Sequence, residues 1–270
     1  MKLSRVISDK IGNIEKILGE MKSVAVAFSG GVDSSLLLKL AHDMLRNNAV
    51  GIYIDSPLQP KRERLLFEET IKLIGCDIIK KPVDILDHKA FKENPTDRCY
   101  FCKHFIFDVI MQIAQNEGYS YVADGSNHDD LKDYRPGAKA LKEKGVRSPL
   151  REAGFTKKEI RELSKFYGLP TWDKEALACL ATRISYGKEI SKRKLQMIDM
   201  AEEELVNRGF INVRARHYDD TVKIEVDKKQ IDKLSDNKNR SEILTIMKKI
   251  GFRYIIIDPE GYRTGSLNES

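Results

Sequence analysis

Short apolar runs alternate with stretches of helical periodicity through the first half of the chain. Apolar residues recurring every three or four positions predict a first helix over residues 3–20. Predicted strands follow at 24–28, 50–54, 78–83 and 121–124, with predicted helices near 35–45, 61–74 and 104–116. Strands separated by helices in this way are typical of a parallel sheet with helices on both faces. We therefore predict an α/β fold whose ligands bind at the carboxyl ends of the strands.

The hydrophobic pattern changes in the last third of the chain, where strands are no longer separated one by one by helices. The predicted elements there are a helix at 191–207 and strands at 213–218, 222–226 and 254–257. This mixture is typical of a small α+β domain. We therefore divide the chain into a first domain of residues 1–184 and a smaller second domain of residues 185–270.

Composition describes an ordinary globular protein, with 41% hydrophobic and 33% charged residues in a chain of 270. No apolar stretch approaches the roughly 20 residues that a membrane-spanning helix needs. The first residues form a polar amphipathic pattern and do not resemble a signal peptide. We therefore expect a cytoplasmic protein without a membrane partner.

The formal net charge of +6 suits an anionic substrate, but it is modest for this length. Lys and Arg are scattered along the chain, and no dense basic stripe of the kind that binds nucleic acid is visible. Charge alone would also suit a nucleotide or RNA and does not decide the partner, but the scattered cations make nucleic acid the less favoured one and a small molecule the expected substrate.

The segment Ser29-Gly-Gly-Val-Asp-Ser-Ser35 follows the first predicted strand and opens the next predicted helix. Small residues at a strand end let the backbone approach an anion, and the free N–H groups of a helix start bind negative charge. No Gly-Lys-Ser/Thr follows the glycines, so this is not a Walker-type loop. We interpret it as a site for the phosphates of ATP. The alternative interpretation is a glycine turn capped by Asp33 or Ser34.

The candidate ATP-binding residues of this loop lie between the end of the strand and the first turn of the helix, and two more lie at other strand ends. They are Ala27, Ser29, Gly30, Gly31, Val32, Asp33, Ser34 and Ser35, together with Asp55 and Gly125. Asp33 is also a candidate catalytic residue, because its carboxylate could hold a magnesium ion beside the phosphates.

A second polar segment, Asp124-Gly-Ser-Asn-His-Asp-Asp130, follows the fourth predicted strand. A magnesium ion that bridges phosphates takes only one or two carboxylates from the protein. Asp33 with Asp129 would be sufficient for such a site. The alternative is a capped turn into a helix, which is common for clusters of Asn and Asp.

Four cysteines are too few for a disulfide scaffold in a chain of this size. Cys76 lies in an apolar run and is predicted to be a small buried hydrophobe. Cys99, Cys102 and Cys179 could bind zinc with His104 or Cys76 as fourth ligand, or hold an iron–sulfur cluster with one iron left open. They could also be three unrelated thiols. A thioredoxin-like pair is disfavoured, because the Cys99-x-x-Cys102 segment is predicted to lie in a loop.

Arg214 and Arg216 are two positions apart on a predicted strand, so both side chains point to the same face of the sheet. Such a pair suits a phosphate or carboxylate of the substrate. Glu202, on the preceding predicted helix, is either a salt-bridge partner or a further substrate contact. The alternative for the two arginines is a solvated strand face.

Together these segments resemble the LarE family of ATP-dependent sulfur transferases, in the superfamily of N-type ATP pyrophosphatases (PP-loop proteins, with the adenine nucleotide alpha hydrolase-like fold). The resemblance rests on Ser29–Ser35, Asp124–Asn127 with Asp129 and Asp130, Arg135-Pro-Gly137, Leu169–Lys174, Ala178–Ile184 and Val213–Arg216. It runs through nearly the whole chain, and the joint match is far more specific than any single segment.

The resemblance implies an enzyme that adenylates a carboxylate of pyridinium-3,5-biscarboxylic acid mononucleotide with Mg²⁺ and ATP, releasing pyrophosphate, and then inserts sulfur to give a thiocarboxylate. The product belongs to the synthesis of the nickel-pincer nucleotide cofactor. In one version of the family a lone cysteine, matching Cys179, gives up its own sulfur. In the other, cysteines matching Cys99, Cys102 and Cys179 hold a [4Fe–4S] cluster that carries an additional sulfide. This chain has all three cysteines, which favours the second version.

The same resemblance implies that Arg214 and Arg216 anchor the substrate phosphate, that a sulfide donor resupplies the cluster, and that the chain forms a homo-oligomer. Two other functions remain open from the sequence. One is a cluster-dependent tRNA thiolase of the same superfamily. The other is a non-catalytic nucleotide-binding carrier of an iron–sulfur cluster.

Overall fold

The computed structural model of the chain describes residues 3–132, 136–175 and 178–263. The chain forms two compact units, and each unit is built from several segments. The first unit comprises Met1–Ser56, Glu63–Ile85 and Asp97–Leu177, and the second comprises Pro57–Arg62, Leu86–Thr96 and Ala178–Ser270. The second unit therefore contains two short segments from the first half of the chain in addition to its carboxyl-terminal part.

A four-stranded sheet forms the centre of the first unit, in the order β3-β2-β1-β4. All three strand pairings are parallel. The strands are β1 (Val24–Ala27), β2 (Ala49–Asp55), β3 (Ile78–Pro82) and β4 (Tyr121–Ala123). Each lies where the hydrophobic pattern predicts a strand, so the prediction of a parallel α/β sheet is confirmed.

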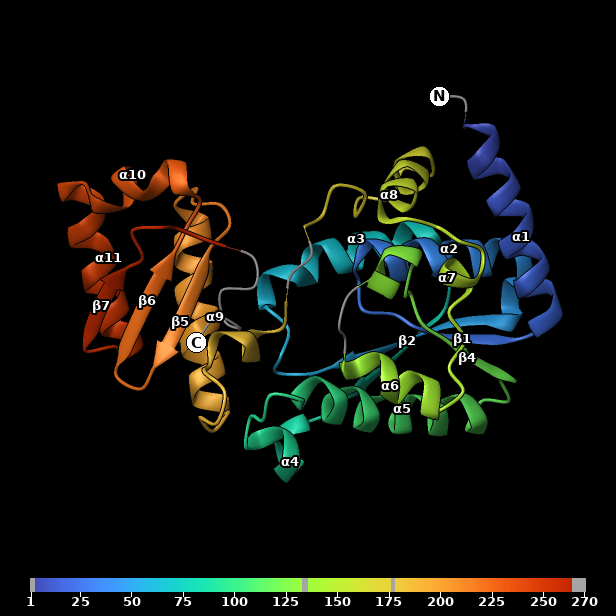
Figure 1. Ribbon diagram of the computed structural model, residues 1–270, viewed down its shortest axis with the longest axis horizontal. Helices are drawn as coiled ribbons and strands as arrows, with labels where there is room; N and C mark the ends of the chain where they lie inside the picture. The colour runs from blue at the N-terminus through green and yellow to red at the C-terminus, as the bar shows by residue number, and fades with distance from the viewer. Residues whose placement is uncertain (1–2, 133–135, 176–177, 264–270) are drawn as a thin grey trace. The chain divides into compact units, whose positions relative to one another are not determined.

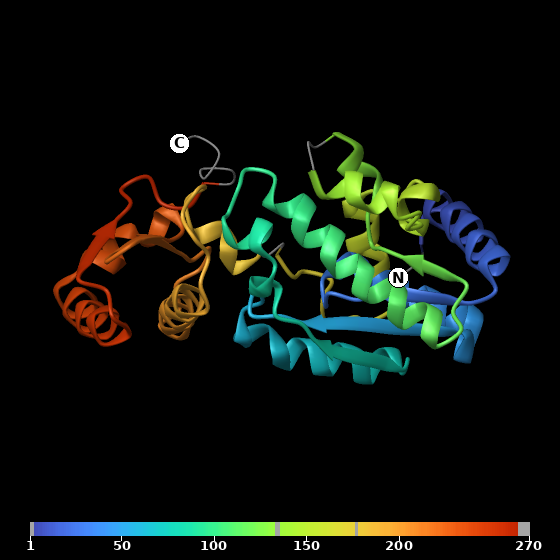
Figure 2. The ribbon, with the colours of Figure 1, turned by 90° about the horizontal axis from the view of Figure 1, so that it is seen from below.

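Helices cover both faces of this sheet, as Figures 1 and 2 show. One buried cluster joins the sheet to α1, α2, α3, α7 and α8, and a second joins it to α5 and α6. The helices are α1 (Arg5–Met21), α2 (Val32–Leu45), α3 (Arg64–Ile74), α5 (Arg98–Asn116), α6 (Pro136–Glu143), α7 (Pro149–Glu152) and α8 (Lys157–Phe166). The two central strands, β1 and β2, are thus largely buried, which explains their continuous apolar runs, whereas the edge strands β3 and β4 are partly exposed.

Alternation along β1 assigns its side chains to the two faces. Val24 and Val26 belong to the cluster with α2, whereas Ala25 belongs to the cluster with α5. On β2, a Cβ added at Gly51 would lie 2.4 Å from Ile78 Cδ1 and 3.0 Å from a methyl carbon of Leu38. Glycine at this position therefore lets α2 pack closely against the sheet, which fixes where the helix starts.

The helix α5 differs from its prediction. It begins at Arg98 and not near residue 104, so Cys99 and Cys102 lie in its first turn and not in a loop. The start of this helix, Arg98-Cys-Tyr-Phe-Cys102, lacks the regular apolar spacing on which the prediction relied. The loop context used against a thioredoxin-like pair is therefore wrong.

The second unit has its own three-stranded sheet, in the order β5-β6-β7. The pairing of β5 with β6 is antiparallel, and that of β6 with β7 is parallel. A buried apolar cluster joins β5 and β6 to α9, α10 and α11. The elements are α4 (Lys89–Lys92), α9 (Lys192–Asn207), β5 (Arg214–Tyr218), β6 (Thr221–Glu225), α10 (Ile231–Ser235), α11 (Asn237–Ile250) and β7 (Tyr254–Ile257). The prediction of a small carboxyl-terminal sheet with helices is confirmed.

Candidate functional site

The glycine-rich loop connects the end of β1 to the start of α2, with Gly31 in the N-cap position. The Ser34 hydroxyl accepts a hydrogen bond from the N–H of Ser29 (3.2 Å) and donates one to the carbonyl oxygen of Gly31 (3.2 Å). Gly30 has a φ of +72°, and a Cβ there would lie 3.0 Å from the ring of Phe67. Glycine at position 30 thus permits both the backbone conformation and the contact with Phe67. The result is a compact turn directly before a helix start.

The end of β4 lies against this helix start. A Cβ added at Gly125 would be 2.8 Å from the backbone nitrogen of Ser34 and 3.1 Å from the carbonyl carbon of Asp33. Both neighbours are backbone atoms, which cannot move aside. The structure therefore brings Gly125 next to the loop, as the two sequence motifs suggested.

Asp33 lies in the first turn of α2 and forms an ion pair with the ammonium group of Lys157. Its other carboxylate oxygen accepts a hydrogen bond from the side-chain amide of Asn127 (3.4 Å). Lys157 is the first residue of α8 and was not among the sequence candidates. The capping box of Thr156 and Glu159 predicts the start of α8 from the sequence, and the structure confirms it, but this local signal does not show that Lys157 reaches Asp33.

Asp129 joins the same group of residues. Its carboxylate accepts a hydrogen bond from the backbone N–H of Lys157 (2.8 Å), and its own N–H donates to the side-chain oxygen of Asn127 (3.0 Å). Asp33 and Asp129 therefore share Lys157 and Asn127 as neighbours. The donor set is two carboxylates beside an anion-binding helix start, which fits a magnesium ion bound mainly by phosphates.

Asp55, the last residue of β2, is exposed and lies 4.0 Å from the guanidinium group of Arg64. Ala27 pairs with Ile52 in the parallel register of β1 and β2, so Ala27 and Asp55 both lie toward the carboxyl ends of neighbouring strands. This is the edge of the sheet from which the glycine-rich loop leaves. The structure thus places Asp55 on the same edge as the loop.

The four cysteines, all of which lie within the described residues, form no disulfide. Cys99 is exposed and Cys102 is partly buried, and they stand three residues apart in the first turn of α5, on one helix face. Both belong to the first unit, whereas Cys179 belongs to the second. Within residues 3–132, 136–175 and 178–263, no group of three or more His, Cys, Asp or Glu side chains is arranged to hold a metal ion.

Cys76 is buried, as predicted, and its thiol lies 3.3 Å from the carbonyl oxygen of Ala49. Burial, reinforced by the charge of Asp77, raises the pKa of Cys76 to about 11. The thiol therefore stays protonated at neutral pH and is a poor metal ligand or nucleophile. Its role is packing, which removes it as the fourth ligand of a zinc site.

A network of buried charges occupies the second unit. The carboxylate of Glu202 on α9 binds Arg183 at 2.7 and 3.1 Å and Arg62 at 3.1 Å, and it accepts the N–H of Ala215 at 3.2 Å. Burial alone would raise the pKa of Glu202, but the charges of Arg183 and Arg62 outweigh it and lower this pKa. Glu202 is therefore held as a carboxylate among arginines.

Arg214 and Arg216 on β5 are both buried, with 6% of each exposed, so the alternative of a solvated strand face is wrong. Arg216 forms two hydrogen bonds with the carboxylate of Glu225, at 2.9 and 3.0 Å. Arg214 stacks on the ring of Tyr262 at 4.5 Å and donates to the carbonyl oxygen of Val213 at 2.7 Å. In the part of the chain that the structure describes, Arg214 pairs with no carboxylate.

The Arg214 side chain therefore carries a buried positive charge that forms no direct ion pair within the described residues, although the charge of Glu202 acts on it. Its burial, together with the charge of Arg183, lowers the pKa of Arg214. Buried charges are normally paired, so a guanidinium without a direct carboxylate partner is a candidate site for an anionic group. Arg183 also connects the network to Cys179, because it donates to the carbonyl oxygens of Ala178 (2.8 Å) and Cys179 (3.2 Å).

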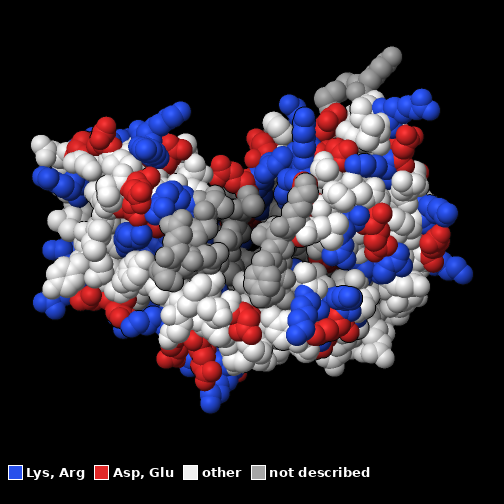
Figure 3. Space-filling view, viewed as in Figure 1, with Lys and Arg blue, Asp and Glu red and all other residues white. Residues whose placement is uncertain are grey.

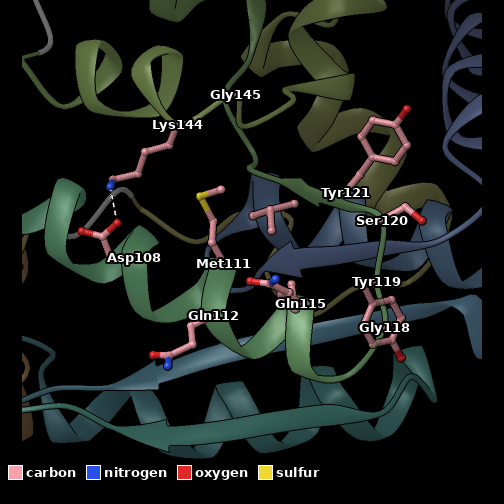
Figure 4. A pocket seen from close by; sticks show the side chains of 12 residues that line it. Asp108, Met111, Gln112, Gln115, Gly118, Tyr119, Ser120, Tyr121, Lys144 and Gly145 are labelled. Carbon is pink, nitrogen blue, oxygen red and sulfur yellow. Dashed lines mark hydrogen bonds and ion pairs between the residues drawn. The ribbon is translucent and has the colours of Figure 1, made fainter.

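A surface groove of about 780 Å³ lies elsewhere on the first unit, between the second half of α5 and the start of β4 (Figure 4). Asp108 and Lys144 form an ion pair at its rim. Because it lies at the amino end of β4, it is at the opposite edge of the sheet from the glycine-rich loop. It does not belong to the candidate site.

Lys and Arg are interspersed with Asp and Glu over the face shown in Figure 3. No helix in the described part of the chain is long and apolar enough to span a membrane. Of the segments that carry the family resemblance, Arg135 lies outside the described residues.

The parallel sheet and the Ser-Gly-Gly-Val-Asp-Ser-Ser loop before α2 define an α/β protein of the PP-loop class. No model of a known protein family matches the chain. Among curated proteins, it is 33% identical over 271 residues to the pyridinium-3,5-bisthiocarboxylic acid mononucleotide synthase of Lactiplantibacillus plantarum, covering 98% of this chain and 95% of that protein. The chain belongs to the family of this synthase, the LarE family.

Two further relatives differ in their sequence identity to this chain. A protein of Synechocystis named only as uncharacterised is 39% identical over 263 residues, covering 97% of this chain and 98% of that protein. A chain of the glutamine-hydrolysing GMP synthase of Archaeoglobus fulgidus is 24% identical over 225 residues, covering 77% of this chain and 73% of that one. The relatives with named activities here are synthases, which supports an enzymatic activity of this chain.

Proposed function

We propose that this protein is an ATP-dependent sulfur transferase that adenylates a carboxylate of pyridinium-3,5-biscarboxylic acid mononucleotide and converts it to a thiocarboxylate, a step toward the nickel-pincer nucleotide cofactor. The observation that carries the proposal is the buried guanidinium of Arg214, which has no direct carboxylate partner among the described residues and is affected by the charge of Arg183. A mononucleotide substrate has a phosphate group to balance that charge.

In this proposal, the loop of residues 29–35 binds ATP for the adenylation step. The helix start of α2 and the ammonium group of Lys157 supply positive potential for the triphosphate. Asp33 and Asp129 would hold a magnesium ion, which neutralises pyrophosphate as it leaves. The attack of the substrate carboxylate on the α-phosphorus forms an acyl–oxygen–phosphorus linkage, so that AMP becomes the leaving group of the next step.

In this proposal, residues of the second unit bind the mononucleotide. Arg214 binds the phosphate group of the mononucleotide, and Arg216 and Arg183 stay fixed by Glu225 and Glu202. Because these two arginines are already paired with carboxylates, their side chains are held in place. In the described part of the chain Arg214 has no such partner, so its guanidinium is available to the ligand. Binding the substrate phosphate in this way fixes one end of the substrate, which supplies part of the rate.

In this proposal, the sulfur-transfer step depends on Cys99, Cys102 and Cys179. The two thiols at the start of α5 and the thiol of Cys179, just before a 3₁₀ helix (Leu180–Arg183), would be the three thiolate ligands of a [4Fe–4S] cluster. When bound, this cluster supplies the sulfide that replaces AMP on the activated carbonyl. The role of Arg183 is to hold the carbonyl oxygens of Ala178 and Cys179, which keeps the Cys179 backbone in one position.

The test is an anaerobic incubation of the reconstituted protein with Mg²⁺, ATP, sulfide and the biscarboxylic acid mononucleotide. The proposal predicts AMP, pyrophosphate and a thiocarboxylate product by mass spectrometry, with pyrophosphate release that depends on the mononucleotide. Release that depends on bulk tRNA would indicate a tRNA thiolase. A protein that binds nucleotide and cluster but releases no pyrophosphate would be a carrier, and either result would overturn the proposal.

A further inference from the structure

Lys174 contacts the glycine-rich loop from a distant part of the chain. Its ammonium group donates to the carbonyl oxygen of Gly30 at 2.8 Å and forms an ion pair with Glu63. Only 13% of the Lys174 side chain is exposed. The ammonium is thus bound by a carboxylate and by the loop, and it does not point freely into solvent.

This contact fixes the orientation of one peptide group. The C=O of Gly30 and the N–H of Gly31 belong to the same planar trans peptide and point in opposite directions. With the oxygen on Lys174, the Gly31 N–H is turned to the other side, where it makes only a long contact (3.4 Å) with the Ser29 hydroxyl. That N–H therefore remains able to bind a phosphate oxygen.

Without such a contact the peptide could rotate easily, because glycine on both sides allows many backbone conformations. A rotated peptide would present the Gly30 carbonyl oxygen where the N–H now lies. An oxygen at this position repels the oxygens of a phosphate. The orientation of this one peptide thus decides whether the turn attracts or repels an anion.

The segment that carries Lys174 is itself firmly held. Arg161 of α8 donates to the carbonyl oxygens of Trp172 (2.9 Å) and Lys174 (2.7 Å). The ammonium group of Lys165 lies 4.2 Å from the centre of the Trp172 ring. Lys174 therefore reaches Gly30 from a backbone position that α8 fixes.

We propose that Lys174 is a positioning residue of the nucleotide site, which holds the Gly30–Gly31 peptide in the orientation that binds the phosphates released as pyrophosphate. The inference rests on the proposed use of ATP and deepens it, because it assigns this lysine a role at the β- and γ-phosphates. It acts through the loop and does not need to touch the nucleotide.

The experiment is calorimetric titration of three variants with magnesium ATP, magnesium pyrophosphate and AMP. For Lys174→Met we expect about ten- to a hundred-fold weaker binding of ATP and pyrophosphate, because one charge-assisted hydrogen bond to the loop is lost. The affinity for AMP should be unchanged. Lys174→Arg keeps a positively charged donor and should recover part of the affinity. Lys165→Met is the matched control, because it removes a lysine that touches the same segment but not the loop, and it should bind all three ligands like the wild type.

Glu63→Gln provides a second variant in case Lys174→Met does not fold, which thermal unfolding would reveal. It removes the charge that holds the Lys174 ammonium, so we expect a smaller loss for the same two ligands. Equal affinities for pyrophosphate in Lys174→Met and wild type, or an equal loss for AMP, would overturn the inference alone. A wild-type protein that binds neither ATP nor pyrophosphate would overturn the proposed function and this inference with it.

Discussion

The ammonium group of Lys157 forms a hydrogen-bonded ion pair with a carboxylate oxygen of Asp33, although 124 positions separate the two residues in the chain. A Walker-type loop carries its phosphate-binding lysine within the motif. In this protein, folding brings a lysine from the start of α8 to the start of α2 instead. The charge of Asp33 is thus paired with an internal cation that the local motif does not contain.

The first prediction concerns Lys157. Replacing it by Met removes a cation beside the phosphates, so we expect the apparent KM for ATP in pyrophosphate release to rise by about ten-fold, the equivalent of one charge-assisted hydrogen bond. Lys158→Met is the matched control, because Lys158 is the exposed neighbour on the same helix turn. The prediction fails if Lys157→Met shows the ATP dependence of the wild type.

The second prediction separates the two arginines of β5. Arg216→Met leaves Glu225 buried with only Lys223 at 3.2 Å as partner, so the free energy of unfolding should fall by about 3 kcal/mol. Arg214→Met leaves no carboxylate unpaired, so it should cost less stability while it weakens binding of the mononucleotide. Urea denaturation and substrate titration of both variants measure the two effects.

The two variants serve as controls for each other, because both remove one buried guanidinium from the same strand. If Arg214→Met were the more destabilising change and left substrate binding intact, Arg214 would be a structural residue. The phosphate site would then have to lie elsewhere.

The fold could be predicted from the sequence largely because its elements have strong local signals. Strands β1 and β2 are short apolar runs that are largely buried, β3 begins with two isoleucines, and periodic helices separate the strands. The start of α5 was missed, because its first turn contains Arg98 and Cys99 where apolar spacing would have been informative. The capping position, Asp97, makes no side-chain hydrogen bond that would mark a helix start.

The candidate site was predictable only where it is contiguous in sequence. The turn of residues 29–35 is a local motif, whereas Lys157 and Lys174 reach it through tertiary folding. Alternation placed Arg214 and Arg216 on one strand face but could not show that this face is buried. Burial of Arg216 depends on Glu225, which the hairpin of β5 and β6 brings opposite. Long-range charge pairing of this kind leaves no periodic signal in a single sequence.

The third prediction is a pH dependence of stability. His217 on β5 is buried, with its ring 5.4 Å from that of Phe252. Burial, and then the charge of Lys194, lower the pKa of His217 from its ordinary value of 6.5. The unfolded state therefore takes up a proton more readily than the folded state, so the stability contributed by neutral His217 is present above about pH 6.5 and is lost as the pH falls below it.

Thermal unfolding between about pH 7.5 and pH 5.5 measures this dependence. In His217→Gln, which cannot titrate, the decrease in stability across this range should be smaller than in the wild type. His104→Gln is the control, because His104 is partly exposed and pairs with Asp108 on the same helix. Parallel curves for His217→Gln and wild type would contradict the assignment of the acid sensitivity to His217.

The fourth prediction distinguishes the cysteines by what they bind. After anaerobic reconstitution, Ser substitution of Cys99, Cys102 or Cys179 should each lower the content of iron and acid-labile sulfide, because each removes one thiolate ligand. Cys76→Ser is the control, because the Cys76 thiol is buried against the carbonyl oxygen of Ala49 and its raised pKa keeps it protonated. That variant should keep its iron. Uptake of zinc instead of iron by the wild-type protein would contradict the cluster. Loss of one sulfur atom from Cys179 during a single turnover would identify Cys179 itself as the sulfur source. Neither outcome would change the proposed nucleotide and phosphate sites.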